Sequence, residues 1–438
     1  MTASASIDLS RYIERLRSSP GPLVQGQVHE IVGLLVEVAG LRAAVGDRLE
    51  AKVDGRRLVL EVLGFRMGRL LAAPLGTTEG IRPGAAVVRT DEGSTAEAGE
   101  ALLGRVIDAF GQPLDGGPPA RCSDRVPLRR DPPPPFARRP IRTPLETGVR
   151  VLDALLPLGL GQRVGLFAGT GVGKSTLLGM LCRRARADVV VVGLVGERGR
   201  EVGDFVRNVL GDEGRKRAVV VTATGDAPPL VRVQGALRAT AIAEYFRDRG
   251  QSVLLVMDSV TRFAMALREA SLAAGEPPVV KGYTPSVFAA LPSLLERAGT
   301  AAGGGAITAI YTVLVEGDDL ADPIADAVRG VLDGHIILSR QLAERGVFPA
   351  VDVLRSVSRV IDDITTPEHR RSAARVRDLM ATYAEASDLI KIGAYVRGSD
   401  PRVDAAIAAE QRIEALIRQG LDDLAPRDQA LRVLHGFG

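Results

Sequence analysis

The stretch AGTGVGKST near the middle of the chain has the residue types and spacing of a phosphate-binding loop. Gly169, Gly171 and Gly173 carry no Cβ atom, so backbone N–H groups in this stretch can point inward at an anion. Lys174 offers a point charge to the β- and γ-phosphates of a nucleotide, and the Ser175 hydroxyl offers a ligand to Mg²⁺. The predicted nucleotide-binding residues are Gly169, Thr170, Gly171, Val172, Gly173, Lys174, Ser175 and Thr176.

The residues on either side place this loop between a strand and a helix. An apolar run at 164–167 precedes it and a helix-forming apolar run at 177–181 follows it, which is the context that a phosphate-binding loop requires. The helix N-terminus adds positive dipole behind the loop. Ala168 stands where the strict pattern begins with Gly, and its methyl group is a small change. The alternative is a glycine-rich turn that carries Lys-Ser by chance.

A carboxylate ends the apolar run at 253–257. Asp258 therefore lies at the tip of a predicted buried strand, the position of an acid that holds Mg²⁺ through a water molecule. Mg²⁺ prefers oxygen ligands and keeps several waters, so Ser175 and Asp258 suffice as its protein ligands. Arg262 lies one helical turn further on and could reach the same site. The alternative role for Asp258 is a cap of the following helix.

The motif GERGRE follows another predicted buried strand, at 189–195. Ligands of open α/β sheets bind outside the carboxyl ends of the strands. Glu197 is placed there to polarise a water for attack on a γ-phosphate, and Arg198 to brace either the phosphate or the glutamate. The alternative is a solvated, charged loop.

Length and composition limit the classes of protein to which the chain can belong. The chain has 438 residues, enough for about three domains. A net charge of +3 with 25% charged residues does not indicate nucleic-acid binding, and four His and two Cys predict neither a metal-ligand cluster nor a disulfide framework. The N-terminus lacks the pattern of a signal peptide, and no apolar run approaches the ~18 residues of a membrane span. We expect a cytoplasmic protein.

The N-terminal segment, residues 1–20, is predicted to contain a short helix over residues 6–17. An isolated helix of this length is marginal in water, so it needs a surface to lie on. That surface is either the body of the protein or a partner. The apolar stripe has helical spacing and consists of Leu9, Tyr12, Ile13 and Leu16.

Three domains are expected after this helix. Residues 21–92 contain several short strands with Gly and Asp turns, which favours a β-barrel. Residues 93–365 alternate strand-like and helix-like patterns, which predicts an α/β domain with a mainly parallel sheet. Residues 366–438 are predicted to be helical, beginning with Thr366 as the cap and Pro367 at the first helical position.

Together these motifs resemble the alpha/beta catalytic-subunit family of rotary ATP synthases, and most closely its ATPases of type III protein export, flagellar or virulence. The likeness extends over residues 24 to 420. The matching blocks are GQRVGLFAGTGVGKSTLLGML at 161, GLVGERGREVGDFV at 193, VLLVMDSVTRFAMALREASLAAGEPP at 253, and TVLVEGDDLADPIADAVRGVLDGHIILSRQLAERGVFPAVDVLRSVSRV at 312.

The resemblance implies a RecA-like P-loop core and Mg²⁺-dependent ATP hydrolysis. It implies that Glu197 is the catalytic carboxylate that activates water, with Lys174 among the catalytic residues and Arg198 and Arg262 as further active-site arginines. Two residues gain roles that composition alone does not suggest. Arg359 resembles an arginine finger that reaches a neighbouring subunit's nucleotide, and Phe348 stands where the family usually has a Tyr stacked on adenine.

The resemblance also implies an assembly and its partners. We expect a homohexamer at the inner-membrane export apparatus. Its partners would be a central stalk protein, a stator-like regulator on the N-terminal helix, the export gate, export substrates and chaperones, with no nucleic acid. Flagellar export is favoured slightly over virulence export. The alternatives are a catalytic subunit of a rotary ATP synthase and an RNA translocase of the Rho type, which the low aromatic content of 4% disfavours.

Overall fold

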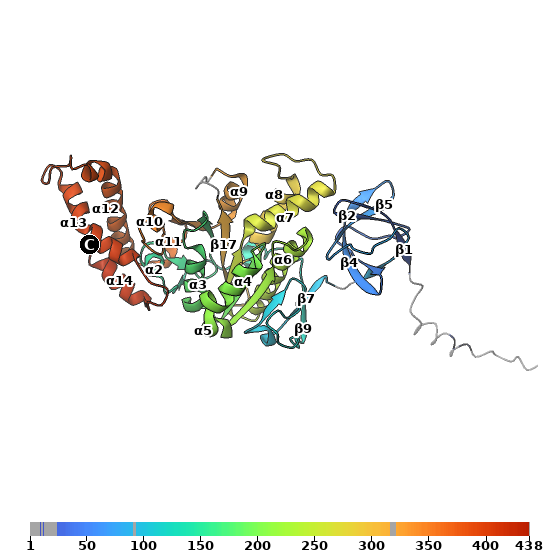
Figure 1. The fold of residues 1–438 in the computed structure, drawn as a ribbon. Helices are drawn as coiled ribbons and strands as arrows, with labels where there is room; N and C mark the ends of the chain where they lie inside the picture. Colours follow the sequence, from blue (N-terminus) through green and yellow to red (C-terminus); the bar gives the residue numbers. More distant parts are fainter. Residues whose placement is uncertain (1–8, 10–11, 13–23, 91–92, 316–320, 438) are drawn as a thin grey trace, which may run out of the picture. The chain divides into compact units, whose positions relative to one another are not determined.

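The computed structural model describes residues 9, 12, 24–90, 93–315 and 321–437, which divide into an N-terminal unit, Met1–Glu92, and a main unit, Gly93–Gly438 (Figure 1). The predicted helix within residues 1–20 lies outside the described residues, except for Leu9 and Tyr12, whose side chains are exposed.

Six antiparallel strands of the N-terminal unit close into a barrel in the order β1-β2-β5-β4-β3-β6. Asp54 and Gly55, both with positive φ, form the two-residue turn between β3 and β4, as expected for the Asp-Gly pair of a hairpin. Alternate apolar residues fill the interior, and closure pairs both edges of the sheet. The strands are β1 (Gln25–Val32), β2 (Leu35–Ala39), β3 (Arg48–Val53), β4 (Arg56–Arg66), β5 (Arg69–Pro74) and β6 (Ala86–Thr90).

The main unit is built on a nine-stranded sheet with the order β19-β18-β12-β17-β15-β13-β14-β8, in which β16 pairs with β17. All its pairs are parallel except those made by β16 and β19. Every residue of β13 is buried, so the centre of the sheet is covered on both faces. The strands are β8 (Val106–Asp108), β12 (Arg163–Ala168), β13 (Val189–Val195), β14 (Ala218–Ala223), β15 (Ser252–Asp258), β16 (Gly299–Thr300), β17 (Ala306–Leu314), β18 (Gly334–Ile337) and β19 (Val357–Ser358).

Helices join these strands, and α6 packs along β13, β14 and β15. The order of elements is that of an α/β domain, as predicted. The helices are α2 (Arg150–Leu155), α3 (Lys174–Arg184), α4 (Gly199–Asp204), the π-helical η3 (Phe205–Leu210), α5 (Gly211–Lys216), α6 (Pro229–Asp248), α7 (Val260–Ala273), α8 (Pro285–Leu295), α9 (Pro323–Val331), α10 (Arg340–Glu344) and α11 (Ile361–Ile364).

Short elements precede this core. The strands β7 (Thr95–Ala98) and β9 (Asp124–Pro127) form one two-stranded sheet, and β10 (Pro144–Leu145) and β11 (Leu158–Gly159) form another. Two 3₁₀ turns, η1 (Glu100–Leu102) and η2 (Pro135–Ala137), lie between them in the chain.

Three helices, α12 (Pro367–Lys391), α13 (Pro401–Ile417) and α14 (Arg427–His435), end the chain. The Thr366 hydroxyl accepts a hydrogen bond from His369 N at 3.2 Å, so Thr366 caps α12 as predicted. The His369 ring bonds Ala154 O of α2 at 2.7 Å, and α14 also packs on α2. This helical part therefore shares one hydrophobic core with the sheet. The predicted fold class, a barrel, an α/β P-loop core and a C-terminal helical part, is confirmed.

Within the part of the chain that the structure describes, none of the helices has both the length and the apolar character to cross a membrane.

Candidate active site

The glycine-rich loop connects β12 to α3. Gly171 and Gly173 have φ angles of 77° and 84°, in the left-handed region that glycine adopts most readily. The helix begins directly at Lys174, and no side chain caps its first N–H groups. These N–H groups and the positive end of the helix dipole are therefore available to an anion.

Lys174 brings two acidic side chains together at the ends of neighbouring strands. Its Nζ lies 2.5 Å from Asp258 Oδ1 and 3.6 Å from Glu197 Oε1. Asp258 is the last residue of β15, and Glu197 follows β13, which pairs with β15 in parallel. The structure therefore brings together the three residues that the sequence singled out for phosphate, metal and water.

Glu197 is only 8% exposed, and Arg262 Nε lies 3.5 Å from its Oε1. Burial raises the pKa of Glu197, and the nearby Asp258 carboxylate raises it further, while Lys174 and Arg262 act in the opposite direction. A carboxylate with a raised pKa in a cleft is typical of a group that accepts protons near neutral pH.

These residues line a cavity of about 550 Å³. Among the predicted residues, Val172 is not in its wall, because its side chain is buried in the core with 1% exposure. Arg198 lies at the wall with an exposed side chain, 3.8 Å from Glu201. The lining consists of Gly169, Thr170, Gly171, Gly173, Lys174, Ser175, Thr176, Leu194, Glu197, Arg198, Glu201, Val202, Phe205, Asp258, Arg262 and Leu314.

Phe348 and Arg359 are not part of this cavity lining. A Cβ atom added to Gly173 would lie 3.1 Å from two ring carbons of Phe348, so the ring edge rests against the glycine-rich loop. Arg359 is exposed and directly follows the edge strand β19, where its backbone N donates to Asp333 O at 3.0 Å.

Sequence reasoning missed Thr312, whose hydroxyl donates to Asp258 Oδ1 at 2.6 Å. The only signal was a threonine near the end of the apolar run of β17, and that run also contains Thr308 and Tyr311. It also missed Phe205, which η3 brings to the cavity, although π-helical turns are frequent at functional sites.

The donor set suits Mg²⁺. Ser175 and Asp258 both line the cavity and present hard oxygen atoms, which Mg²⁺ prefers. Groups of three or more His, Cys, Asp or Glu that could form an all-protein metal site do not occur among the described residues. A cation here would therefore depend on water and phosphate oxygens for its other ligands.

Three family models match most of the chain. The nucleotide-binding domain of the ATP synthase alpha/beta family matches residues 148–358, and the beta-barrel domain of the same family matches residues 28–91. The T3SS EscN ATPase C-terminal domain matches residues 365–436.

Two curated relatives are similar over nearly their full lengths. The flagellum-specific ATP synthase of Pseudomonas aeruginosa is 51% identical over 420 residues, which cover 95% of this chain and 93% of that protein. The type 3 secretion system ATPase of Xanthomonas euvesicatoria is 48% identical over 411 residues, which cover 93% of each chain.

Two solved structures share the fold. The assembled ATPase EscN from the type III secretion system of enteropathogenic E. coli is 43% identical, with a TM-score of 0.89 over 94% of this chain and 99% of EscN. EscN in complex with its central stalk EscO is 42% identical, with a TM-score of 0.87 and the same coverage. The chain therefore belongs to the ATP synthase alpha/beta family of nucleotide-binding ATPases, in the branch of the flagellum-specific and type III secretion ATPases.

Proposed function

We propose that this chain hydrolyses MgATP to energise type III protein export. The observation that supports this most directly is the meeting of Lys174, Asp258 and Glu197 at one cavity. A cation for the phosphates, an acid for the metal and a proton acceptor are the parts that in-line attack of water on a γ-phosphate requires.

Each residue has one task in this reaction. The glycine-rich loop binds the phosphates through its N–H groups, and Lys174 contacts the β- and γ-phosphates. Ser175 and Asp258 would hold Mg²⁺, which neutralises charge on the transferred phosphoryl group. Glu197 orients the attacking water and accepts its proton.

Arginines complete the stabilisation of charge. Arg262 lies beside Glu197, and Arg198 lines the cavity with an exposed side chain. Phe348, beside Gly173, offers an aromatic face to the base. Arg359 is exposed at the edge of the sheet, so we assign it to the active site of a neighbouring copy.

This assignment requires a ring, and we propose a homohexamer. EscN, which is similar over 94% of this chain, has been solved as an assembled ATPase. We also propose four segments in each copy: an N-terminal helix in 1–20, a barrel in 21–92, the P-loop core in 93–365 and the helical domain in 366–438.

The connection between α12 and α13 is the proposed contact with a central stalk protein. Leu389 in the last turn of α12 exposes 52% of its surface, and Ile392 and Val396 in the connection expose 75% and 70%. EscN has been solved in complex with its central stalk EscO, which supports a stalk partner for this chain.

The remaining partners follow from a role in export. We place the ring in the cytoplasm at the inner-membrane export apparatus, with a stator-like regulator on the N-terminal helix and the export gate, substrates and chaperones as further partners. The chain is 51% identical to the flagellum-specific relative and 48% identical to the type 3 secretion relative. Because these identities are similar, flagellar export is only slightly favoured over virulence export.

Phosphate release by the purified full-length chain tests the core of this proposal. Release should require both ATP and Mg²⁺, and it should be lost in Lys174→Ala. Turnover that persists in this variant would contradict the assigned site.

A further inference from the structure

Gln419 joins the C-terminal helices to two parts of the nucleotide-binding region. It is 3% exposed, and its backbone N donates to Phe348 O at 2.7 Å. Its side-chain Oε1 accepts from Arg150 N at 2.8 Å, and Nε2 donates to Gly148 O at 2.9 Å and to Asp423 O at 3.1 Å. One buried residue thus fixes both the Phe348 backbone and the start of α2.

The turn that contains Gly148, to which Gln419 donates, is fixed by hydrogen bonds to Asp153. Asp153 accepts hydrogen bonds from Thr147 N at 2.9 Å, from the Thr147 hydroxyl at 2.8 Å and from Gly148 N at 3.0 Å. The turn at Gly148 is therefore fixed by Asp153, so it cannot move together with Gln419 if Gln419 is displaced. Displacing Gln419 leaves buried polar groups on both sides without partners, which is costly.

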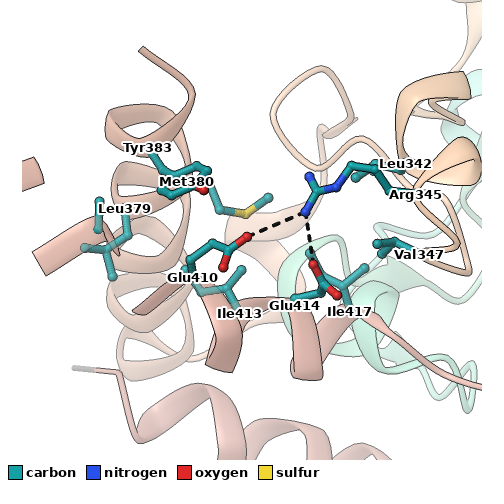
Figure 2. Close-up of a pocket in the computed structure, with 11 residues that line it drawn as sticks. Leu342, Arg345, Val347, Leu379, Met380, Tyr383, Glu410, Ile413, Glu414 and Ile417 are labelled. Carbon is teal, nitrogen blue, oxygen red and sulfur yellow. Dashed lines mark hydrogen bonds and ion pairs between the residues drawn. The ribbon is translucent and has the colours of Figure 1, made fainter. Parts of the chain in front are cut away.

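The residues just before Phe348 have further ties to α13. Arg345 contacts Glu414 at 3.1 Å and Glu410 at 3.5 Å, as Figure 2 shows. Arg418, the neighbour of Gln419, donates to Gly346 O at 2.9 Å. These ion pairs are partly exposed and individually weak, so the buried Gln419 bonds are the principal link.

We propose that Gln419 is a positioning residue for the base of the nucleotide. It holds Phe348 against Gly173, so that the aromatic face stands at a fixed distance from the loop that binds the phosphates. The inference rests on the proposed stacking role of Phe348. It predicts that Gln419 controls affinity for the base and leaves phosphate binding and chemistry unchanged.

Gln419→Glu in the full-length chain provides the test, because it keeps the size of the side chain and replaces its NH₂ donor with an oxygen. The KM for ATP should rise about tenfold with kcat nearly constant, because stacking acts on the ground state and transition state alike. The inhibition constant of magnesium tripolyphosphate, which has no base, should not change. Gln411→Glu, on the exposed side of α13, is the matched control and should match the wild type.

A second pair of variants separates this inference from the proposed function. In Phe348→Ala, the KM for ATP should rise, and adding Gln419→Glu should raise it no further. If Phe348→Ala weakens ATP binding while Gln419→Glu does not, Gln419 has no positioning role and the stacking role stands. An unchanged KM in Phe348→Ala would contradict the stacking role and with it this inference.

A purely structural role for Gln419 predicts a different result. Tripolyphosphate and ATP would then weaken together, and kcat would fall with the thermal unfolding midpoint. That outcome would overturn the proposal. If Gln419→Glu does not fold, Gln419→Ala takes its place, with the same expected split between ATP and tripolyphosphate.

Discussion

The Thr312 hydroxyl donates a hydrogen bond to Asp258 Oδ1 at 2.6 Å, the oxygen that Lys174 also contacts. The two residues belong to neighbouring parallel strands, β17 and β15. Thr312 is fully buried, so this bond fixes the carboxylate without competition from water. The proposed metal acid therefore has an orienting partner in the sheet behind it.

Thr312→Val removes this hydroxyl and keeps the size and β-branching of the side chain. We expect the Mg²⁺ concentration for half-maximal ATP hydrolysis to rise about tenfold or more, because partners that orient metal ligands typically contribute this much. Titration of Mg²⁺ at saturating ATP measures the effect. Thr312→Ser retains the hydroxyl and should stay close to the wild type. Equal behaviour of the Val and Ser variants would show that the bond has no part in metal binding.

Glu197→Gln should retain nucleotide binding and lose more than about 100-fold in kcat, because an amide cannot accept the proton of the attacking water. Binding of a fluorescent ATP analogue and phosphate release measure the two quantities separately. Glu213→Gln, a surface variant on α5, is the control and should leave both unchanged. Hydrolysis by Glu197→Gln at the wild-type rate would refute the role of Glu197.

The stability of the main unit should carry a pH dependence that originates at Asp153. Burial raises its pKa from 3.8 to about 6, despite the hydrogen bonds from Thr147 and Gly148. The folded state therefore binds this proton more tightly than the unfolded state. The contribution of this proton to the free energy of unfolding is fully present below about pH 4 and is lost as the pH rises through about 6. The loss is about 3 kcal/mol at most.

Denaturant unfolding of the wild type and of Asp153→Asn across this pH range measures the effect. The unfolding free energy of the wild type minus that of the variant should fall from pH 4 to pH 6.5 and then stay constant. If this value, wild type minus variant, instead rises with pH, the buried carboxylate is stabilised in its charged form by its hydrogen-bond donors.

The sequence predicts most accurately those elements whose structure depends on their own consecutive residues. The strand at 189–195 was predicted to the residue, because a buried parallel strand consists of a continuous apolar run. The start of α6 at Pro229 is less evident from the sequence, because Pro228-Pro229 is compatible with a loop as well as with the first turn of a helix, where proline is favoured.

Contacts between distant segments could not be predicted in this way. Thr312 meets Asp258 only because Met257 pairs with Tyr311, and strand register is a property of the folded sheet. Gln419 meets Phe348 and Gly148 through the packing of the C-terminal helices, and no local pattern marks it. The residues of the glycine-rich loop are consecutive, so their motif was visible in the sequence.

In the proposed ring, a complete active site combines Lys174 of one copy with Arg359 of the next. Arg359→Ala should bind ATP, form rings and hydrolyse about 10³-fold more slowly, the effect typical of losing an arginine finger. Lys174→Ala should also be inactive.

Mixing these two inactive variants is the most direct measurement. In a mixed ring, an Arg359→Ala copy with an intact Lys174 meets a Lys174→Ala copy with an intact Arg359, and their shared interface is complete. At equal amounts about a quarter of the interfaces are of this kind, so ATP hydrolysis should return toward that fraction of the wild-type rate. If the variants co-assemble and hydrolysis stays absent at every ratio, Arg359 does not act on a neighbouring copy and the proposed ring mechanism is wrong.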